Sequence, residues 1–540
     1  MTPPPSPSPA DATTKPTAPS TSSNSTWTLR KSLTVALGAL VALVVWSIGA
    51  EYSVLATARS SFLSVILSAS DVDADDAASV EFYPKEVFET DWAAKIPDAE
   101  QLHLLALHSA CVKHKDSVIP WHFGLSGNDE NDDATRNPEQ VLVNEDDPDL
   151  LEKLRQCPDV DVFLPAGIRS FGYCEDAAAY TKFLQSRMLP AWVATVAFHD
   201  AERNHTFTYH DLCPNTPMLF FNHYWDGVPT SPSWPPTKPL YLMPNIEMYE
   251  LQAEHYWKAD VVLCKTAICA RYLNKWFRQE GNPKNTQVMY TRHTTSNVAL
   301  AVREQIGDDA IAPKNFSNVR FTHTAGTSIQ KGTSRILDCW LKRPHFPPVD
   351  VYIAEQLYKN DFKSRFDEAI QKAENVNLHV GKLDTIQFGK VIAEGSFFLC
   401  PSFQEGYGHY INQARASGGV IVTTDVAPMN ELITRDSGVL IHSEVYGFKE
   451  QFLGGKSEHP HALWGVQGFV ADLRGENVCA SIDAMLSENT PRDYEEMAQR
   501  AHQQFLFDTI FFAQKMQELR EFARAKSHHY LRKEPASAIP

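Results

Sequence analysis

The sequence lacks the patterns of several common protein classes. Its nine cysteines include no C-x-x-C pair, which argues against a zinc site. No G-x-x-x-x-G-K-[ST] motif and no internal repeat of 20–50 residues is present, so P-loop nucleotide chemistry and solenoid folds have no support. The 49 basic residues are outnumbered by 66 acidic ones and form no broad basic face. We therefore expect no nucleic acid partner.

Most of the net charge of −17 comes from two short segments. Residues 71–89 carry seven acidic residues against one lysine, and residues 129–152 carry ten against one arginine. The rest of the chain is nearly neutral. We interpret the second segment as containing a solvated acidic loop, and the first as part of a stem at residues 51–95.

The N-terminal region contains the single long apolar run of the sequence. Pro, Ser and Thr make up 20 of the first 28 residues, which predicts a disordered cytoplasmic tail over residues 1–31. Residues 32–50 carry no charge for 19 positions, which is about enough for a transmembrane helix. Arg30 and Lys31 before this run, with Glu51 after it, favour a signal-anchor with the remaining chain in a secretory lumen. A signal peptide cleaved near residue 58 is an alternative, although the run is long for one.

The cysteines fit either redox state at this point. Cys264 and Cys400 lie in apolar, strand-like runs, which favours buried thiols there. Disulfides among the others are possible, and the sequence does not reveal their pairing.

Short apolar runs alternate with amphipathic stretches over the following 440 residues. Such alternation predicts βαβ units and parallel sheets, that is, an α/β fold. Helical patterns occupy residues 334–341 and 361–373. The expected strands are residues 102–107, 160–164, 192–198, 218–221, 240–243, 261–263, 319–323, 349–353, 376–380, 396–400 and 420–424.

Two strand-turn-helix segments carry the residues suited to chemistry. The strand at 319–323 leads into a loop with Gly326, Lys331 and Gly332, whose backbone N–H groups and cation could hold a diphosphate. The strand at 396–400 leads into Glu405, a carboxylate suited to sugar hydroxyls, followed by flexible glycines. A third loop follows the strand at 420–424. All three are expected at one edge of a parallel sheet, where ligands bind.

The order of these motifs resembles the donor domain of GT-B glycosyltransferases of family 4. The resemblance covers residues 319–441 and includes G-x-x-x-x-K-G, P-S-x-x-E-G-Y-G, a glycine pair, T-D-x-x-P-x-N-E-L and S-G-V-L-I. It implies two Rossmann-like domains facing a cleft. We expect an acceptor-side domain at residues 96–300, a nucleotide-sugar donor domain at 301–490, and helices at 491–540 that cross back to the first domain.

The resemblance also implies roles for individual residues. Lys331 would neutralise the donor diphosphate, and Glu405 would hold the hexose, which makes them the expected catalytic residues. The other expected donor-binding residues are Gly326, Thr327, Gly332, Gly406, Tyr407, Gly408, Gln413, Asn430 and Glu431.

Two positions depart from the family pattern. Gln413 replaces the second carboxylate of an E-x7-E pair, and an amide binds a ribose hydroxyl more weakly than a carboxylate does. Thr327 stands where many members carry an arginine. Either Arg292 supplies the missing cation or donor affinity is lower.

The sequence therefore predicts a membrane-anchored glycosyltransferase that moves a hexose from a nucleotide-sugar, such as a UDP- or GDP-hexose, to a glycan, glycoprotein or glycolipid. The family resemblance implies a retaining, metal-independent reaction with no cofactor beyond this co-substrate. A single-pass type II protein of the Golgi or endoplasmic reticulum membrane is expected. Asn204 and Asn315 begin possible glycan-acceptor sequons in that topology.

Acceptor-side residues are harder to predict. Gly167 follows a strand and could form a flexible loop facing the cleft. The other candidates on the acceptor or phosphate side are His199, His223, Arg292 and His293. A histidine at any one of these positions is more often structural than functional.

Two alternatives stay open. A metal-dependent GT-A transferase would need a D-x-D site, for which Asp71-Val72-Asp73 and Asp159-Val160-Asp161 are candidates. The departures at Thr327 and Gln413 could instead mark a GT-B protein that binds glycans or nucleotides without turnover.

Overall fold

The computed structural model describes residues 83–125, 138–200, 204–248, 251–445 and 460–533. The predicted tail, the membrane span at 32–50, Asp71-Val72-Asp73 and most of the stem lie outside these ranges, as does part of the acidic loop. Within the described ranges, no helix combines the length and the apolar character that crossing a bilayer requires.

The first sheet has seven strands in the order β1-β3-β2-β6-β7-β8-β9. All neighbours pair in parallel except β1, which is antiparallel to β3. The strands are β1 Ile119–Pro120, β2 Asp161–Phe163, β3 Arg187–Leu189, β6 Met218–Phe221, β7 Leu240–Met243, β8 Val261–Cys264 and β9 Gln287–Tyr290.

The second sheet has six parallel strands in the order β12-β11-β10-β13-β14-β15. This is the doubly wound order of dinucleotide-binding folds, in which the chain direction across the sheet reverses between the first and fourth strands. The strands are β10 Phe321–Gly326, β11 Val349–Ile353, β12 Val376–Val380, β13 Phe397–Cys400, β14 Val420–Thr424 and β15 Gly438–Ile441.

Helices cover these sheets. Those of the first part are α3 Glu86–Glu89, α4 Asp98–Lys113, α6 Leu150–Arg155, α7 Phe171–Phe183, α8 Tyr209–Leu212, α9 Ala253–Lys258 and α10 Ala267–Glu280. Those of the second part are α11 Val298–Ile306, α12 Thr333–Trp340, α13 Glu355–Leu357, α14 Lys363–Lys372, α15 Thr385–Glu394, α16 His409–Ala416, α17 Met429–Leu432, α18 Gly475–Glu488 and α19 Pro491–Lys533.

The inner strands β2, β3, β6, β7 and β8 of the first sheet are buried on both faces. Alternate residues enter two separate hydrophobic clusters: Phe220 and Leu242 belong to one, which contains Trp276 of α10, and Leu219 and Tyr241 to the other. The second cluster also contains Phe512 of α19. Two covered faces explain why the strands read as continuous apolar runs in the sequence.

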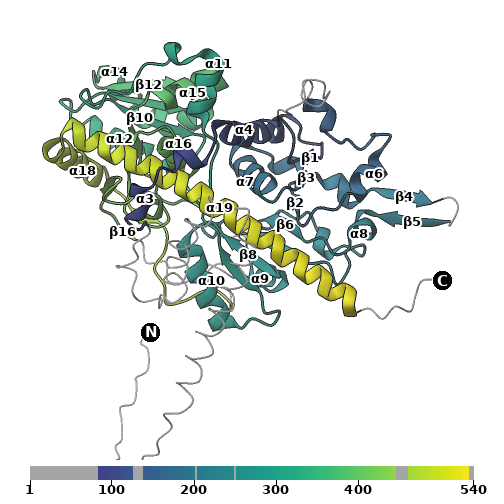
Figure 1. Ribbon diagram of the computed structural model, residues 1–540. Helices are drawn as coiled ribbons and strands as arrows, with labels where there is room; N and C mark the ends of the chain where they lie inside the picture. Colours follow the sequence, from purple (N-terminus) through teal and green to yellow (C-terminus); the bar gives the residue numbers. More distant parts are fainter. Residues whose placement is uncertain (1–82, 126–137, 201–203, 249–250, 446–459, 534–540) are drawn as a thin grey trace, which may run out of the picture. The chain divides into compact units, whose positions relative to one another are not determined.

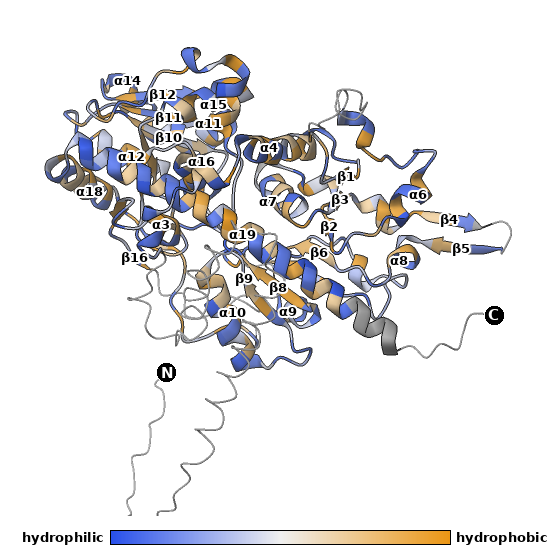
Figure 2. Cartoon of the chain, in the orientation of Figure 1, coloured by the Kyte–Doolittle hydropathy of each residue, from blue (hydrophilic) through white to orange (hydrophobic). Residues whose placement is uncertain are grey.

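Helix α19 belongs to both parts of the fold. It contacts α16, β14 and β15 of the second part and α7 of the first, and Figure 1 shows it running past both. Figure 2 shows hydrophilic and hydrophobic residues alternating along its length, the pattern of a helix that buries one face.

The α/β prediction is confirmed, but two of the expected strands are wrong. Residues 102–107 lie inside α4, where Leu104, Leu107 and Cys111 share one buried helix face. Residues 192–198 form a 3-10 turn and the start of β4 Ala197–Asp200, which pairs with β5 His205–Thr208 in a separate two-stranded sheet. Tertiary packing decides whether such a short apolar run forms a helix or a strand.

Eight cysteines form four disulfides, with Cα atoms 5.5–5.7 Å apart. The pairs are Cys111–Cys174, Cys157–Cys213, Cys264–Cys269 and Cys339–Cys479. The expectation of a free thiol is therefore wrong for Cys264, whose partner lies one helical turn into α10. Cys400 remains a buried thiol.

This pairing predicts the outcome of thiol counting. Alkylation of the unreduced, denatured chain should label one cysteine, Cys400, whereas alkylation after reduction should label all nine. Mass spectrometry of tryptic peptides checks both numbers. Labelling of Cys264 or Cys269 without reduction would contradict the structure.

Candidate functional site

The strand order of the second sheet reverses between β10 and β13. In doubly wound sheets, ligands bind outside the carboxyl ends of the strands at this point, because the two following loops diverge to opposite faces there. The loop after β10 carries Lys331, and the loop after β13 carries Glu405. These are the two residues that the family resemblance predicts to be catalytic.

The two loops meet at a glycine. Gly332 has φ +72°, and a Cβ atom at this position would lie 1.9 Å from the carbonyl oxygen of Pro401. The backbone N–H of Phe403 also donates to the carbonyl of Gln330 at 2.8 Å. Only glycine allows both this dihedral angle and this approach.

Lys331 and Glu405 form an ion pair at the junction. The Lys331 Nζ atom lies 2.6 Å from Glu405 Oε1 and 3.7 Å from the centre of the Tyr410 ring. The Ser402 hydroxyl donates to the same Glu405 oxygen at 2.5 Å and lies 2.5 Å from the Tyr410 hydroxyl. Both charged side chains are partly exposed, with 17% and 12% of their surfaces accessible, so a ligand can reach them.

The first sheet presents polar groups to the same loop. A Cβ atom on Gly406 would lie 2.4 Å from Glu247 Oε1 and 2.8 Å from Asn245 Oδ1. Both residues follow β7, and Asn245 N–H donates to Asn222 Oδ1 at 2.5 Å. Asn222 follows β6, so the ends of two strands in one sheet face the glycine loop of the other.

Glu247 has an altered acidity in this position. Burial raises its pKa to about 7, and the nearby Glu405 carboxylate raises it further, while a backbone hydrogen bond and Lys265 oppose the rise. Near neutral pH this side chain therefore exists in both protonation states.

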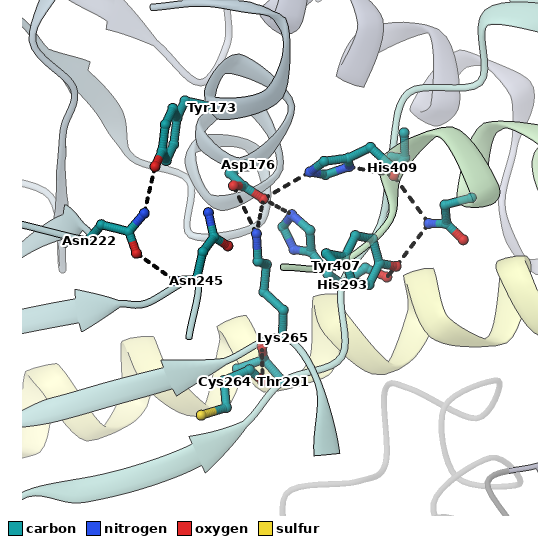
Figure 3. Close-up of polar contacts among 12 residues, drawn as sticks. Tyr173, Asp176, Asn222, Asn245, Cys264, Lys265, Thr291, His293, Tyr407 and His409 are labelled. Atoms are coloured by element: carbon teal, nitrogen blue, oxygen red, sulfur yellow. Dashed lines mark hydrogen bonds and ion pairs between the residues drawn. The ribbon is translucent and has the colours of Figure 1, made fainter. Parts of the chain in front are cut away.

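A second charged cluster joins the sheets around Asp176 of α7. The Lys265 Nζ atom lies 2.9 and 3.0 Å from its two carboxylate oxygens. His293 Nε2 lies 2.9 Å and His409 Nε2 3.1 Å from Oδ1, as Figure 3 shows. Burial alone would raise the pKa of Asp176, but Lys265 and the two histidines hold it well below its ordinary value.

Asp176, His293 and His409 are close enough together to supply ligands to a metal ion. The ammonium group of Lys265 already lies against both oxygens of Asp176. A divalent cation there would be repelled by this charge. The donor set therefore fits a buried ion-pair cluster better than a metal centre.

Arg292 lies in a third buried cluster. Its Nη1 atom is 2.5 Å from Asp508 Oδ1 of α19, and Arg415 Nη2 of α16 is 2.8 Å from Asp508 Oδ2. The Tyr83 hydroxyl donates to the same carboxylate at 2.7 Å. Arg292 thus neutralises a protein carboxylate rather than standing beside Lys331 as a second phosphate cation.

A small cavity lies between the Asp508 and Asp176 clusters. Its lining contains both charged and aromatic side chains from the two sheets and α19. The residues that line it are Tyr83, Lys265, Thr266, Tyr290, Arg292, His293, Tyr407, Pro428, Glu431, Leu432 and Asp508.

Other predicted donor-site residues have structural partners. Glu431 accepts hydrogen bonds from the N–H groups of Ala267 at 2.6 Å and Ile268 at 2.8 Å, so it caps α10 of the first part. Tyr407 is buried and donates to the carbonyl of His293 at 2.8 Å. Asn430 donates to Asp425 Oδ1 at 3.1 Å.

Gln413 and Thr327, the two departures from the family pattern, lie in different surroundings. Gln413 Nε2 lies 3.4 Å from Glu175 Oε1 of α7, a long contact. Gly326 and Thr327 are exposed at the end of β10. Gly408, with φ +106°, immediately precedes α16.

The acceptor-side candidates are dispersed. Gly167 is exposed in the turn after β2, and His199 lies on the β4–β5 hairpin. His223 follows β6, and its ring lies tilted against that of Tyr224, with ring centres 4.4 Å apart. Of the five candidates, His293 is linked to the region of Glu405. It contacts Asp176, which also contacts His409 at the end of the loop that carries Glu405.

The second D-x-D candidate is occupied by ion pairs. Asp159 accepts from Arg520 and Arg524 of α19, and Asp161 is fully buried beside Arg187 and Tyr209. These carboxylates are therefore not free to hold a metal.

Sequence reasoning missed Asn222, Asn245, Glu247 and Lys265. Asn222 and Lys265 directly follow a strand, and Asn245 and Glu247 follow β7 by two and four residues. Position relative to the predicted strands was the available signal, since carboxyl ends of parallel strands share one edge. Asp176 gave no such signal, because it lies inside a helix.

Comparisons with known proteins give a likeness of fold only. No protein-family model matches the chain, and no curated protein matches it. A trehalose 6-phosphate synthase from Burkholderia multivorans is 9% identical, covers 71% of this chain and 100% of its own, and has a TM-score of 0.47. A glycosyltransferase from Rickettsia africae is 11% identical, covers 68% and 99%, and has a TM-score of 0.44. A sucrose-phosphate synthase from Thermosynechococcus elongatus is 12% identical, covers 63% and 84%, and has a TM-score of 0.41.

The Asp508 cluster predicts a large loss of stability on neutralisation. Asp508→Asn removes the carboxylate that two buried guanidinium groups share, which should lower the free energy of unfolding by about 3–5 kcal/mol. Urea denaturation followed by fluorescence measures it. The matched control is Asp483→Asn, which breaks the exposed pair with Arg343 and should cost less than about 1 kcal/mol. An equal loss of unfolding free energy in the two variants would contradict a stabilising role for the buried Asp508 carboxylate.

The raised pKa of Glu247 predicts that the stability difference between the wild type and Glu247→Gln depends on pH. Its pKa in the folded chain lies above the unfolded value, so burial of the charged form penalises folding increasingly as pH rises from about 4.5 to about 7. Glu247→Gln removes this penalty. The variant should gain on the order of 1–3 kcal/mol over the wild type at pH 7.5 and little at pH 4.5. Thermal unfolding at both pH values tests this, and a difference independent of pH would contradict it.

Proposed function

We propose that this protein is a glycosyltransferase that transfers a hexose from a nucleotide-sugar to a glycan, glycoprotein or glycolipid. The observation that carries the proposal is the ion pair of Lys331 and Glu405 at the strand-order reversal of the second sheet. A cation for a diphosphate and a carboxylate for sugar hydroxyls stand there side by side. The order of motifs from residue 319 to 441 supports the same conclusion.

Donor binding would separate the two charges. Lys331 Nζ would turn from Glu405 to the diphosphate, and Glu405 would then accept hydrogen bonds from the sugar. The N-terminus of α12, which starts at Thr333 directly after this loop, would add a partial positive charge near the phosphates.

The reaction needs little covalent chemistry from the protein. The bond between the anomeric carbon and the phosphate oxygen breaks, the electron pair leaves with the diphosphate, and the acceptor oxygen bonds to the carbon. Lys331 and backbone N–H groups stabilise the charge that develops on the leaving group. In the retaining course that we propose, the departing phosphate takes the acceptor's proton, and no metal ion is required.

We also propose that the chain is anchored in the Golgi or endoplasmic reticulum membrane by residues 32–50, with the catalytic part in the lumen. The four disulfides support this location, because disulfides persist in oxidising compartments and are rare in the cytosol.

A second candidate function is donor or glycan binding without turnover. The long Gln413 contact and the exposed Thr327 favour it, since neither residue supplies the charge of its family counterpart. Binding of a nucleotide-sugar with no hydrolysis or transfer by the wild type would favour this function.

The site predicts a matched pair of inactive variants. Lys331→Ala and Glu405→Gln should each lower sugar-nucleotide hydrolysis or transfer by about 100-fold or more, because each removes a group that stabilises the transition state. The donor is first chosen by thermal shift with UDP, GDP and their hexose esters; a ligand at 100 times its Kd adds about 2.7 kcal/mol. Released nucleoside diphosphate is then measured.

The control is Lys342→Ala, an exposed lysine paired with Glu476 on the surface, which should retain wild-type turnover. Turnover by Lys331→Ala and Glu405→Gln at the wild-type rate would remove this site assignment.

A further inference from the structure

The turn after β7 is a built polar surface rather than a loose loop. Met248 N–H donates to the Asn245 carbonyl at 3.0 Å and closes the turn. The fully buried Asn222 accepts from Asn245 N–H at 2.5 Å and donates to the Tyr173 hydroxyl at 2.5 Å. Asn222 and Asn245 therefore fix the turn to two neighbouring strand ends, as Figure 3 shows.

Two hydrogen-bond acceptors of this turn face the glycine loop of the second sheet. Asn245 Oδ1 and Glu247 Oε2 are buried and have no hydrogen-bond partner among the described residues. Unpaired buried acceptors are costly, which makes them strong candidates for contacts with a ligand. Both oxygens lie against Gly406, since a Cβ atom at this position would be 2.8 Å from each of them.

Gly406 is the residue after Glu405. A sugar that donates to Glu405 would therefore lie close to the β7 turn, which contacts the next residue of the loop. Because Gly406 has no side chain, the Glu247 carboxylate and the Asn245 amide oxygen can lie directly against its backbone.

We infer that Asn245 and Glu247 bind hydroxyl groups of the transferred sugar from the opposite side to Glu405, and that the donor sugar is a neutral hexose rather than a uronic acid. This inference rests on the proposed function and names the substrate class for the same site.

The charges around the turn give the preference for a neutral sugar. The Glu405 and Asp176 carboxylates both lie close enough to Glu247 to raise its pKa. The two nearby cations are engaged, Lys331 with Glu405 and Lys265 with Asp176. With Lys331 assigned to the diphosphate, a sugar carboxylate would meet like charges without a cation of its own.

The test compares the affinity for a nucleoside diphosphate with that for its sugar esters, by calorimetry. The probes are UDP and GDP, their neutral hexose esters, and UDP-glucuronate. In the wild type, the neutral hexose should raise affinity over the diphosphate alone, and glucuronate should lower it.

Two substitutions at Glu247 separate its hydrogen bonds from its charge. Glu247→Ala should reduce the hexose-dependent gain in affinity by about tenfold, without changing the affinity for the diphosphate alone. Glu247→Gln keeps the hydrogen-bonding capacity, so it should stay within about threefold of wild type for the hexose ester and bind glucuronate more tightly. The control is Glu254→Ala, an exposed glutamate of α9.

The outcomes distinguish this inference from the function it rests on. If the wild type binds a neutral hexose ester and Glu247→Ala keeps the full hexose gain, Glu247 only packs the two sheets together and the inference is wrong. Wild-type preference for glucuronate overturns the substrate class alone. A wild type that binds no nucleotide-sugar overturns the proposed function as well. Glu247→Gln, which hardly changes the side-chain volume, tests the effect of the charge on glucuronate binding even if Glu247→Ala fails to fold.

Discussion

Buried carboxylates that neutralise cations from both sheets are the constraint on which the rest of the structure depends. Asp508 of α19 lies between Arg292, which follows the first sheet, and Arg415 of α16. Asp176 of α7 pairs with Lys265, which follows β8, and is also contacted by His409 of α16. Breaking either cluster would leave an uncompensated charge out of water, which is far more costly than losing a surface ion pair. The two carboxyl edges are therefore held facing each other.

This constraint explains how the candidate site is assembled. Glu431 of α17 caps α10 of the first part, and the Asp176 cluster fixes the start of α16. The glycine loop between β13 and α16 is thereby brought against the turn after β7. The proposed site is consequently formed by residues of both sheets, and the family resemblance had described only one of its sides.

The sequence predicted the strands well where burial left a single interpretation. Residues 218–221, 240–243, 349–353 and 420–424 match β6, β7, β11 and β14, because parallel strands buried on both faces are short apolar runs between turn signals. Residues 376–380 match the edge strand β12, which is only partly buried. It failed at residues 102–107, because a helical and a strand pattern cannot be told apart over so few residues. It also missed the edge strand β9, whose residues are mostly half-buried.

The sequence by itself determined the α/β fold class and the proximity expected for Lys331 and Glu405, because both follow strands of one sheet and the edge of a parallel sheet gathers such loops. Tertiary structure alone decided that Arg292 faces Asp508, 216 residues away, that Glu431 caps a helix, and that Glu247 lies beside Gly406. Local patterns encode where a strand ends. They do not encode which distant charge a buried group meets, since that depends on how the two sheets pack together.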